Sequence, residues 1–342
     1  MGYTLKLDIY YFSLKKIKEE RQQKINNKVK ISYITEENEC TFGEFIYSLP
    51  FEQINQSNYT EILLKDFIKG FNSSFKKNKE NTQAISTTDE HFKGFSSKNY
   101  TLWGIFKGGP TGINQEIYES DNAIEPTSTI DNSKVSTLYY FYKLWLPYDS
   151  NIGVLMVQSY TSIGCTSLFK KQLEQYFIQK GHKITNWSKC IPNEYIKKYL
   201  LDGYINEIQV IHAKKDKSRP LEPIFSPLTY AQRKEIFNNF NISFTNLIKL
   251  HNYKSVLKSQ IKAISTDYNE HEDVVKIFYK DSKGHNAHSN LADIESILPT
   301  ITLDESLKDE NTQQPKWNEL HTFTNELLES IKEQISYTPK LI

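Results

Sequence analysis

The stretch Leu138-Tyr-Tyr-Phe-Tyr-Lys-Leu-Trp-Leu146 decides the fold, because nearly every position is aromatic or aliphatic. Turn residues interrupt it at Pro147-Tyr-Asp-Ser-Asn151, and a second apolar run follows from Ile152 to Tyr160. Two runs of this length with turn residues between them predict an antiparallel hairpin, and Gly153 gives its second strand room to bend. The sequence therefore predicts a sheet built around this hairpin.

The segment after the hairpin predicts a helix, a second short helix and a third strand. Apolar residues recur with a helical period after Thr166 or Ser167, either of which can cap the helix, and Lys180-Gly181 ends it. Pro192 opens the short helix, which runs through Leu201. Tyr204 to Ile211 alternates, as a strand with one buried face does. A basic cluster follows at once: His212, Lys214, Lys215, Lys217 and Arg219.

The N-terminal third mixes strand and helix patterns. Strands are expected at Leu5–Phe12, Val29–Ile34 and Tyr100–Phe106. Helices are expected over the charged stretch Leu14–Asn26 and over Ser57–Phe75, where Ser57 or Asn58 provides the cap. Ile124 to Ser133 predicts a loop.

The C-terminal third opens with Pro220, Pro223 and Pro227, which rule out a continuing helix. Ala231–Asn239 is expected to be helical, and Val274–Tyr279 predicts a strand. Trp317–Ile335 is a strongly periodic amphipathic helix, which either packs within the monomer or forms a dimer contact.

The pattern as a whole predicts an α+β protein with mixed or antiparallel sheets, flanking helices and two subdomains. Three regions are distinguished along the chain: an N-terminal α+β region at 1–133, a basic hairpin-helix-strand segment at 134–219, and a C-terminal α+β region at 220–342 that ends in the amphipathic helix. A chain of 342 residues exceeds the usual size of a single core.

Composition favours a folded protein of the cytoplasm. No signal peptide pattern opens the sequence, and no run approaches the roughly eighteen apolar residues that a membrane span requires. Cys40, Cys165 and Cys190 are odd in number and widely spaced, which fits neither a disulfide framework nor a paired-cysteine metal site. We expect ordinary reduced thiols.

The charge is distributed unevenly although the net charge is only +1. The segment from Lys134 to Arg219 holds 13 basic and 6 acidic residues, whereas the chain from Lys258 onwards holds 9 basic and 15 acidic residues. A positive central surface would attract phosphates; alternatively, the lysines are scattered over solvated faces. Arg21, Arg219 and Arg233 are the only arginines, so any nucleic acid would be held mainly by its backbone, with a strong dependence on salt.

The sequence contains no recognisable catalytic motif, and no cofactor site is expected. Gly108-Gly-Pro-Thr-Gly112 lacks the spacing of a phosphate loop, so a glycine-rich turn is favoured, although its backbone N–H groups and Lys107 could still touch a phosphate. His285 and His288 lack further ligands nearby, and Glu270, Glu272 and Asp273 are better explained as a solvated acidic loop than as a metal site. Among the hairpin aromatics, Tyr140 or Tyr142 could face a base, but core packing is favoured.

The order of elements from Phe141 through the glycine, the two helices and the strand at 204–211 resembles a group of bacterial and prophage defence proteins of the RexA and KwaB kind. The resemblance covers about residues 138–211, with a fainter echo at 274–335. It implies a homodimeric, α+β, DNA-binding component of phage defence without a defined catalytic centre. The phosphate contacts would fall on Lys197, Lys198, Lys214, Lys215 and Lys217.

The expected function is therefore phage defence through sequence-independent binding of nucleic acid, with DNA favoured over RNA. The full set of expected contact residues is Lys197, Lys198, Lys214, Lys215, Lys217, Arg219 and Lys107. The protein is expected to act as a dimer and with an enzyme or membrane partner of the defence system. Two alternatives stay open: a metal-dependent nuclease that uses scattered carboxylates, and an interaction protein that recognises a phage protein through the amphipathic C-terminal helix.

Overall fold

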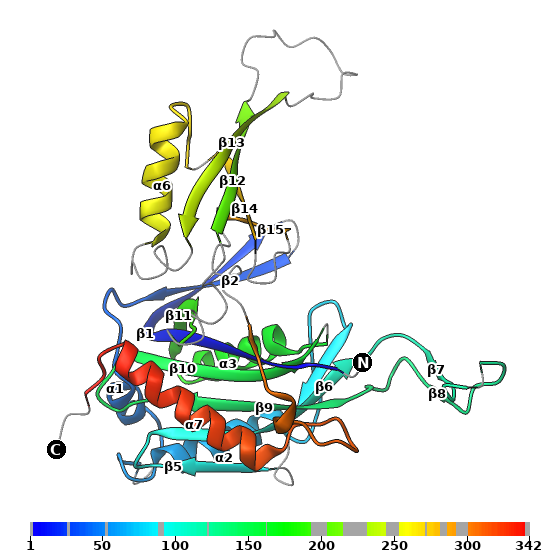
Figure 1. The fold of residues 1–342 in the computed structure, drawn as a ribbon. Helices are drawn as coiled ribbons and strands as arrows, with labels where there is room; N and C mark the ends of the chain where they lie inside the picture. The colour runs from blue at the N-terminus through cyan, green and yellow to red at the C-terminus, as the bar shows by residue number, and fades with distance from the viewer. Residues whose placement is uncertain are drawn as a thin grey trace. The chain divides into compact units, whose positions relative to one another are not determined.

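A computed structural model describes residues 3–25, 28–51, 54–87, 92–121, 123–161, 163–192, 204–214, 231–243, 253–270, 272–280, 286–291 and 300–338. The chain forms two compact units, one comprising Met1–Cys190 with Thr300–Ile342 and the other Ile191–Pro299. Both contain antiparallel sheets and helices, which confirms the predicted α+β class (Figure 1). Among the described residues, no helix combines the length and the apolar character needed to traverse a bilayer.

A large antiparallel sheet organises the first unit. Its main path runs in the order β11-β1-β10-β9-β6-β4-β3, while β16 and β2 pair with β1 and β5 pairs with β6. The strands are β1 (Leu5–Ile25), β2 (Lys28–Thr35), β3 (Lys76–Lys77), β4 (Gln83–Ser86), β5 (Lys93–Ser96), β6 (Thr101–Pro110), β9 (Leu138–Trp145), β10 (Ile152–Tyr160), β11 (His182–Lys189) and β16 (Ile301–Thr302).

The predicted hairpin is confirmed as β9 and β10, which pair antiparallel with Val154 opposite Trp145. Strand β9 pairs with β10 on one edge and with β6 on the other. Helices cover both faces of the sheet, so β9 is buried on both faces. Tyr140, Tyr142 and Leu144 share one face by strand alternation, and Phe141, Lys143 and Trp145 share the other. The hairpin is thus the middle of the core.

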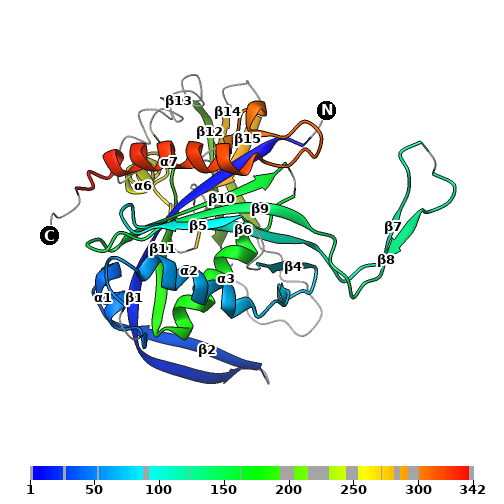
Figure 2. The ribbon, with the colours of Figure 1, turned by 90° about the horizontal axis from the view of Figure 1, so that it is seen from below.

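Three helices cover one face of this sheet: α1 (Phe42–Tyr47), α2 (Tyr59–Phe71) and α3 (Thr166–Gln179) (Figure 2). The α2 helix contributes Phe67 and α3 contributes Phe169, and both rings pack against Tyr142, with centroids 6.1 and 4.9 Å away. Helix α3 starts at the predicted position, although the expected side-chain cap is absent and Cys165 occupies the N-cap.

The opposite face is covered by α7 (Trp317–Gln334), the predicted amphipathic helix (Figure 2). Leu320, Leu327, Leu328 and Ile331 are its buried apolar residues. A short 3-10 turn, η2 (Glu305–Leu307), precedes it. The packing of α7 within its own unit confirms the monomer alternative for this helix.

The helix expected over Leu14–Asn26 is wrong, because β1 continues through this stretch to Ile25. Beyond Ile17 the strand pairs with β2 and forms a hairpin. Lysine, glutamate and glutamine are good helix formers, but intrinsic propensity contributes little free energy per residue, so pairing with a neighbouring strand overrides it.

The second unit has a four-stranded sheet in the order β13-β12-β14-β15. Its elements are β12 (Tyr204–Lys214), β13 (Ala231–Ser243), α6 (Tyr253–Ile264), β14 (Val274–Lys280) and β15 (Asn286–Asn290). The strands predicted at 204–211 and 274–279 are confirmed. The helix predicted at Ala231–Asn239 is wrong, because this stretch pairs with β12 along its length.

The compact units divide the chain differently from the three predicted regions. Strand β1 from the first region pairs with β10 from the second, and β16 from the third pairs with β1 again. Hydrogen bonds between strands distant in sequence therefore join parts that composition alone separates.

An arm leaves the sheet between β6 and β9 and extends away from it in both views (Figures 1 and 2). It comprises residues 111–136 and contains the two-stranded sheet of β7 (Gln115–Ile117) and β8 (Ser128–Ile130). The loop predicted at Ile124–Ser133 thus includes a short strand.

Candidate nucleic-acid interface

Most of the residues predicted to contact phosphate fall outside the described part of the chain. Lys197, Lys198, Lys215, Lys217 and Arg219 all lie there. Lys214 is the last residue of β12, where the structure describes the backbone only.

Lys107 belongs to the other unit, on β6, and its ammonium nitrogen lies 5.8 Å from the centroid of the Phe75 ring. Lys107 and Lys214 therefore belong to different compact units.

The glycine-rich stretch beside Lys107 is a strand end and a turn. Gly108 and Gly109 belong to β6, and a Cβ on Gly109 would lie 1.9 Å from the carbonyl oxygen of Ser136. Gly112 turns the chain with φ +82°, and its N–H donates to the carbonyl oxygen of Asn132. The glycines allow close backbone packing, and the Gly112 N–H is already used within the fold.

The aromatic residues of the hairpin serve the core. Tyr140, Tyr142 and Trp145 are buried, so the suggestion that Tyr140 or Tyr142 faces a base is wrong. Tyr140 stacks on Phe106 at a centroid distance of 5.1 Å. Apolar surroundings on both faces of β9 leave no ring of these three open to a ligand.

A lysine-lined groove lies between α2 and β5 in the first unit, and it has a volume of about 820 Å³. Its floor is apolar and includes Leu64 and Ile68. Around it lie Glu61, Lys65, Lys69, Asn72, Ser73, Thr87, Lys93, Gly94 and Phe95. We call this feature the α2–β5 groove.

Helix and strand periodicity place the groove's cations together. Lys65 and Lys69 are four residues apart on α2, so they lie on one helix face. Lys93 and Phe95 are two residues apart on β5, and both are exposed while Gly94 between them is partly covered. The absence of a side chain at Gly94 admits Trp103, whose ring would lie 2.4 Å from an added Cβ.

The segments of the chain that contribute to the groove are rich in lysine. Described residues 59–87 and 92–107 contain eight lysines but only three acidic residues, Glu61, Asp66 and Glu80. Lys65 forms an exposed ion pair with Glu61, and Lys180 of α3 pairs with Asp66. The remaining excess of positive charge favours an anionic ligand.

The sequence contained the signal for this groove, although the prediction missed it. Lysines four apart on a predicted helix, followed by lysine and phenylalanine two apart, mark a basic face beside an aromatic ring. The prediction overlooked it because β5 is short, contains Gly94 and was not recognised as a strand.

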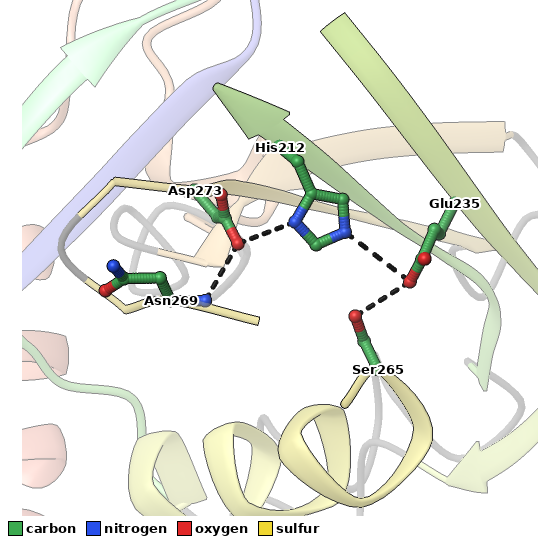
Figure 3. A network of polar contacts seen from close by, with 5 residues as sticks. All are labelled: His212, Glu235, Ser265, Asn269 and Asp273. Atoms are coloured by element: carbon green, nitrogen blue, oxygen red, sulfur yellow. Dashed lines mark hydrogen bonds and ion pairs between the residues drawn. The ribbon is translucent and has the colours of Figure 1, made fainter. Parts of the chain in front are cut away.

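A second polar cluster lies in the other unit and centres on His212 of β12 (Figure 3). Its Nδ1 lies 2.8 Å from the carboxylate of Asp273, and its Nε2 lies 3.5 Å from that of Glu235. Ser265 donates to the same Glu235 oxygen, and the backbone N–H of Asn269 donates to Asp273.

This cluster is buried and links elements of the second unit; it does not line an accessible site. His212 is only 2% exposed, and its Nε2 makes no well-aligned hydrogen bond. The contacts join β12, β13 and the turn between α6 and β14. Asp273, predicted to belong to a solvated acidic loop, instead holds the imidazole, a pairing across 61 positions that no local pattern reveals.

A third cluster lies under α7 in the first unit. The ammonium of Lys143 donates to the carbonyl oxygen of His321 at 3.0 Å and to the side-chain oxygen of Asn325 at 2.7 Å. Burial, together with the nearby Lys332, lowers the pKa of Lys143 to about 7. Burial and Lys143 lower the pKa of His321, whose ring stacks on Trp103, to about 4.

No group of three or more histidine, cysteine, aspartate or glutamate side chains suited to a metal ion occurs within the described ranges. Glu270 is paired with Lys258, and Asp273 with His212. The structure thus gives no specific support to the predicted nuclease alternative.

Comparison with known proteins adds no family to this picture. The sequence matches no family model, and neither a curated protein nor a solved structure matches the chain.

Proposed function

We propose that this protein binds nucleic acid through the sugar-phosphate backbone, without sequence preference, and that the α2–β5 groove is part of the contact surface. The observation that carries the proposal is the convergence of Lys65, Lys69 and Lys93 on one groove with an exposed phenylalanine. Cations that surround an aromatic ring are the combination used for single-stranded nucleic acid.

The chemistry of the groove favours backbone contact over base recognition. All three of its cations are lysines, flexible point charges that lack the planar fork by which arginine recognises guanine. The exposed pair of Lys65 with Glu61 contributes only about 0.3–0.5 kcal/mol, so a phosphate can replace the carboxylate at small cost. Phe95, 40% exposed, offers a face for one base, worth about 1–3 kcal/mol.

The biological role that we propose is defence against phage in the cytoplasm, acting on DNA in preference to RNA and together with a partner protein. The resemblance of the hairpin-helix-strand segment to phage-exclusion proteins supports this role. The basic cluster after β12, from Lys214 to Arg219, would add a second phosphate-binding surface. Lys197 and Lys198 are further proposed phosphate contacts.

Binding of a fluorescent single-stranded oligonucleotide at increasing salt tests the function. We expect affinity to fall steeply, with the logarithm of the binding constant changing by about −0.7 per phosphate contact for each logarithmic unit of salt. Absence of binding at low salt, or binding that does not respond to salt, would refute the proposal. The same mixture with magnesium or manganese tests the nuclease alternative, since a binding protein leaves the oligonucleotide intact.

A further inference from the structure

The arm at residues 111–136 displays apolar side chains that a monomer leaves in water. Ile113 is 62% exposed and Ile124 is 89% exposed, and Ile117 and Tyr118 are exposed between them. These are four of the ten large apolar side chains found exposed in the described part of the chain. Four exposed apolar side chains on one projecting element indicate an interaction surface.

The arm is also acidic. Its described residues include Glu116, Glu119, Asp121, Glu125 and Asp131, against the single cation Lys134. Two such arms would repel each other if they paired directly, because like charges would face across the contact. The chemistry of the arm therefore demands a partner surface that is basic at its rim and apolar within.

The α2–β5 groove of the same chain has these properties. Leu64, Ile68 and Phe95 are its apolar lining, and Lys65, Lys69 and Lys93 are its cations. Its volume of about 820 Å³ lies within the range of about 300–1,000 Å³ typical of ligand pockets, so it has room for several side chains of the arm. The arm extends away from the sheet in both views, so it does not fold back over its own unit (Figures 1 and 2).

We propose that the arm of one copy of this chain seats in the α2–β5 groove of a second copy. Reciprocal exchange of two arms gives a closed twofold dimer with two identical contacts. A pair of strands standing alone is marginally stable in water, and seating in the groove supplies the packing that β7 and β8 lack. A net charge of +1 that divides into an acidic arm and a basic groove favours association between copies.

The dimer contact uses the same groove as the proposed function, so it predicts competition. The arm brings carboxylates and apolar side chains to the lysines that would otherwise hold phosphates and a base. Binding of nucleic acid and binding of the second copy's arm are then mutually exclusive. In the absence of nucleic acid, the groove is occupied by the arm.

Charge-reversal variants analysed by sedimentation velocity test whether the arm–groove contact forms the dimer. The arm variant Glu119→Lys with Glu125→Lys and the groove variant Lys65→Glu with Lys69→Glu should each raise the dimer dissociation constant by at least about tenfold. Combining all four changes in one chain should restore the dimer, which a merely structural defect would not do. The matched control, Glu37→Lys with Glu310→Lys, reverses two exposed charges elsewhere and should dimerise like the wild type.

The outcomes separate this inference from the proposed function. A wild-type chain that stays monomeric, a dimer that survives either reversal, or four combined changes that fail to restore the dimer would overturn the arm-groove contact. Loss of oligonucleotide binding in the groove variant with an unchanged dimer would overturn the contact and leave the function standing. Arm-dependent dimers that never bind an oligonucleotide would support the contact and refute the function.

Discussion

Lys143 lies in the most costly environment of any described lysine, because its ammonium is removed from water beneath α7. The side chain is 1% exposed, and its two hydrogen-bond acceptors are uncharged oxygens of His321 and Asn325. Without a carboxylate partner, burial opposes the charged form and the pKa falls to about 7. The neutral amine and the ammonium thus coexist near physiological pH.

Replacing Lys143 with methionine should remove a specific part of the pH dependence of stability. Between pH about 7 and the ordinary lysine value of 10.5, the unfolded chain holds a proton that the folded protein lacks. The free energy of unfolding therefore rises with pH through this window, by at most about 1.4 kcal/mol per pH unit, and levels off above it.

Urea unfolding followed by tryptophan fluorescence measures this effect, since all four tryptophans lie in the first unit. Lys143→Met should be more stable than the wild type near pH 7, with the difference shrinking towards pH 10. The exposed Lys171→Met in the same unit is the control and should keep the wild-type slope. A constant difference across the pH range would contradict the assigned burial of the charge.

His212 has a structural role in which one imidazole separates two carboxylates. Its replacement by alanine removes the hydrogen bond to Asp273 and the contact with Glu235, and leaving a buried polar group without its partner costs about 1–3 kcal/mol. His212→Gln keeps an amide donor near Asp273 and should lose less.

Hydrogen–deuterium exchange is the suitable measurement for His212, because the second unit contains no tryptophan. His212→Ala should accelerate exchange in peptides from β12 and β14, while the tryptophan-monitored unfolding of the first unit stays unchanged. Protection equal to that of the wild type would show that the His212 cluster does not stabilise the second unit.

At the scale of elements, the close packing of β6 against the segment before β9 requires glycine at position 109. Gly109 faces the Ser136 carbonyl oxygen with no space for a methyl group, whereas Gly70 in α2 has no atom within 4 Å of its added Cβ. The same substitution should therefore have opposite effects at the two positions.

Gly109→Ala should destabilise the first unit by about 1–3 kcal/mol through overpacking. Gly70→Ala, the matched control, should stabilise it by about 0.5–1 kcal/mol because alanine favours a helix. Chemical unfolding monitored by tryptophan fluorescence compares the two. Equal stability of both variants would contradict the close packing of β6 on the base of the arm.

The elements also show which parts of the fold are predictable from local sequence. The β9–β10 hairpin and α7 were predicted because their apolar residues repeat with the period of the structure that they form. The second half of β1 and the part of β13 up to Asn239 were predicted as helices because their charged residues hide any alternation. Their strand structure comes from partners far along the chain, β2 and β12, which local sequence does not specify.

For the candidate site, the sequence predicted the type of contact but not the residues that make it. Lysine-rich composition indicated backbone contacts to phosphate, but the described cations that converge are Lys65, Lys69 and Lys93, none of which was predicted. Their convergence depends on β5 pairing with β6 beside α2, a tertiary arrangement. Lys107, which was predicted, lies against Phe75 instead.

At the scale of the whole molecule, a nearly neutral chain separates its charges into distinct surfaces. Lysines dominate around α2 and β5, and carboxylates dominate on the arm. Separation of this kind permits both attraction of polyanions and self-association, whereas the same residues scattered evenly would do neither. Binding of nucleic acid is the central claim that follows from it.

The most direct test of that claim is the salt dependence of oligonucleotide binding by a groove variant, Lys65→Gln with Lys69→Gln and Lys93→Gln. The control variant, Lys18→Gln with Lys171→Gln and Lys262→Gln, loses the same charge from exposed positions elsewhere. We predict that the groove variant loses affinity and that its logarithmic salt slope becomes shallower by about 2, close to 0.7 for each phosphate contact removed. The control should keep the wild-type slope. Equal slopes for the two variants would contradict the account.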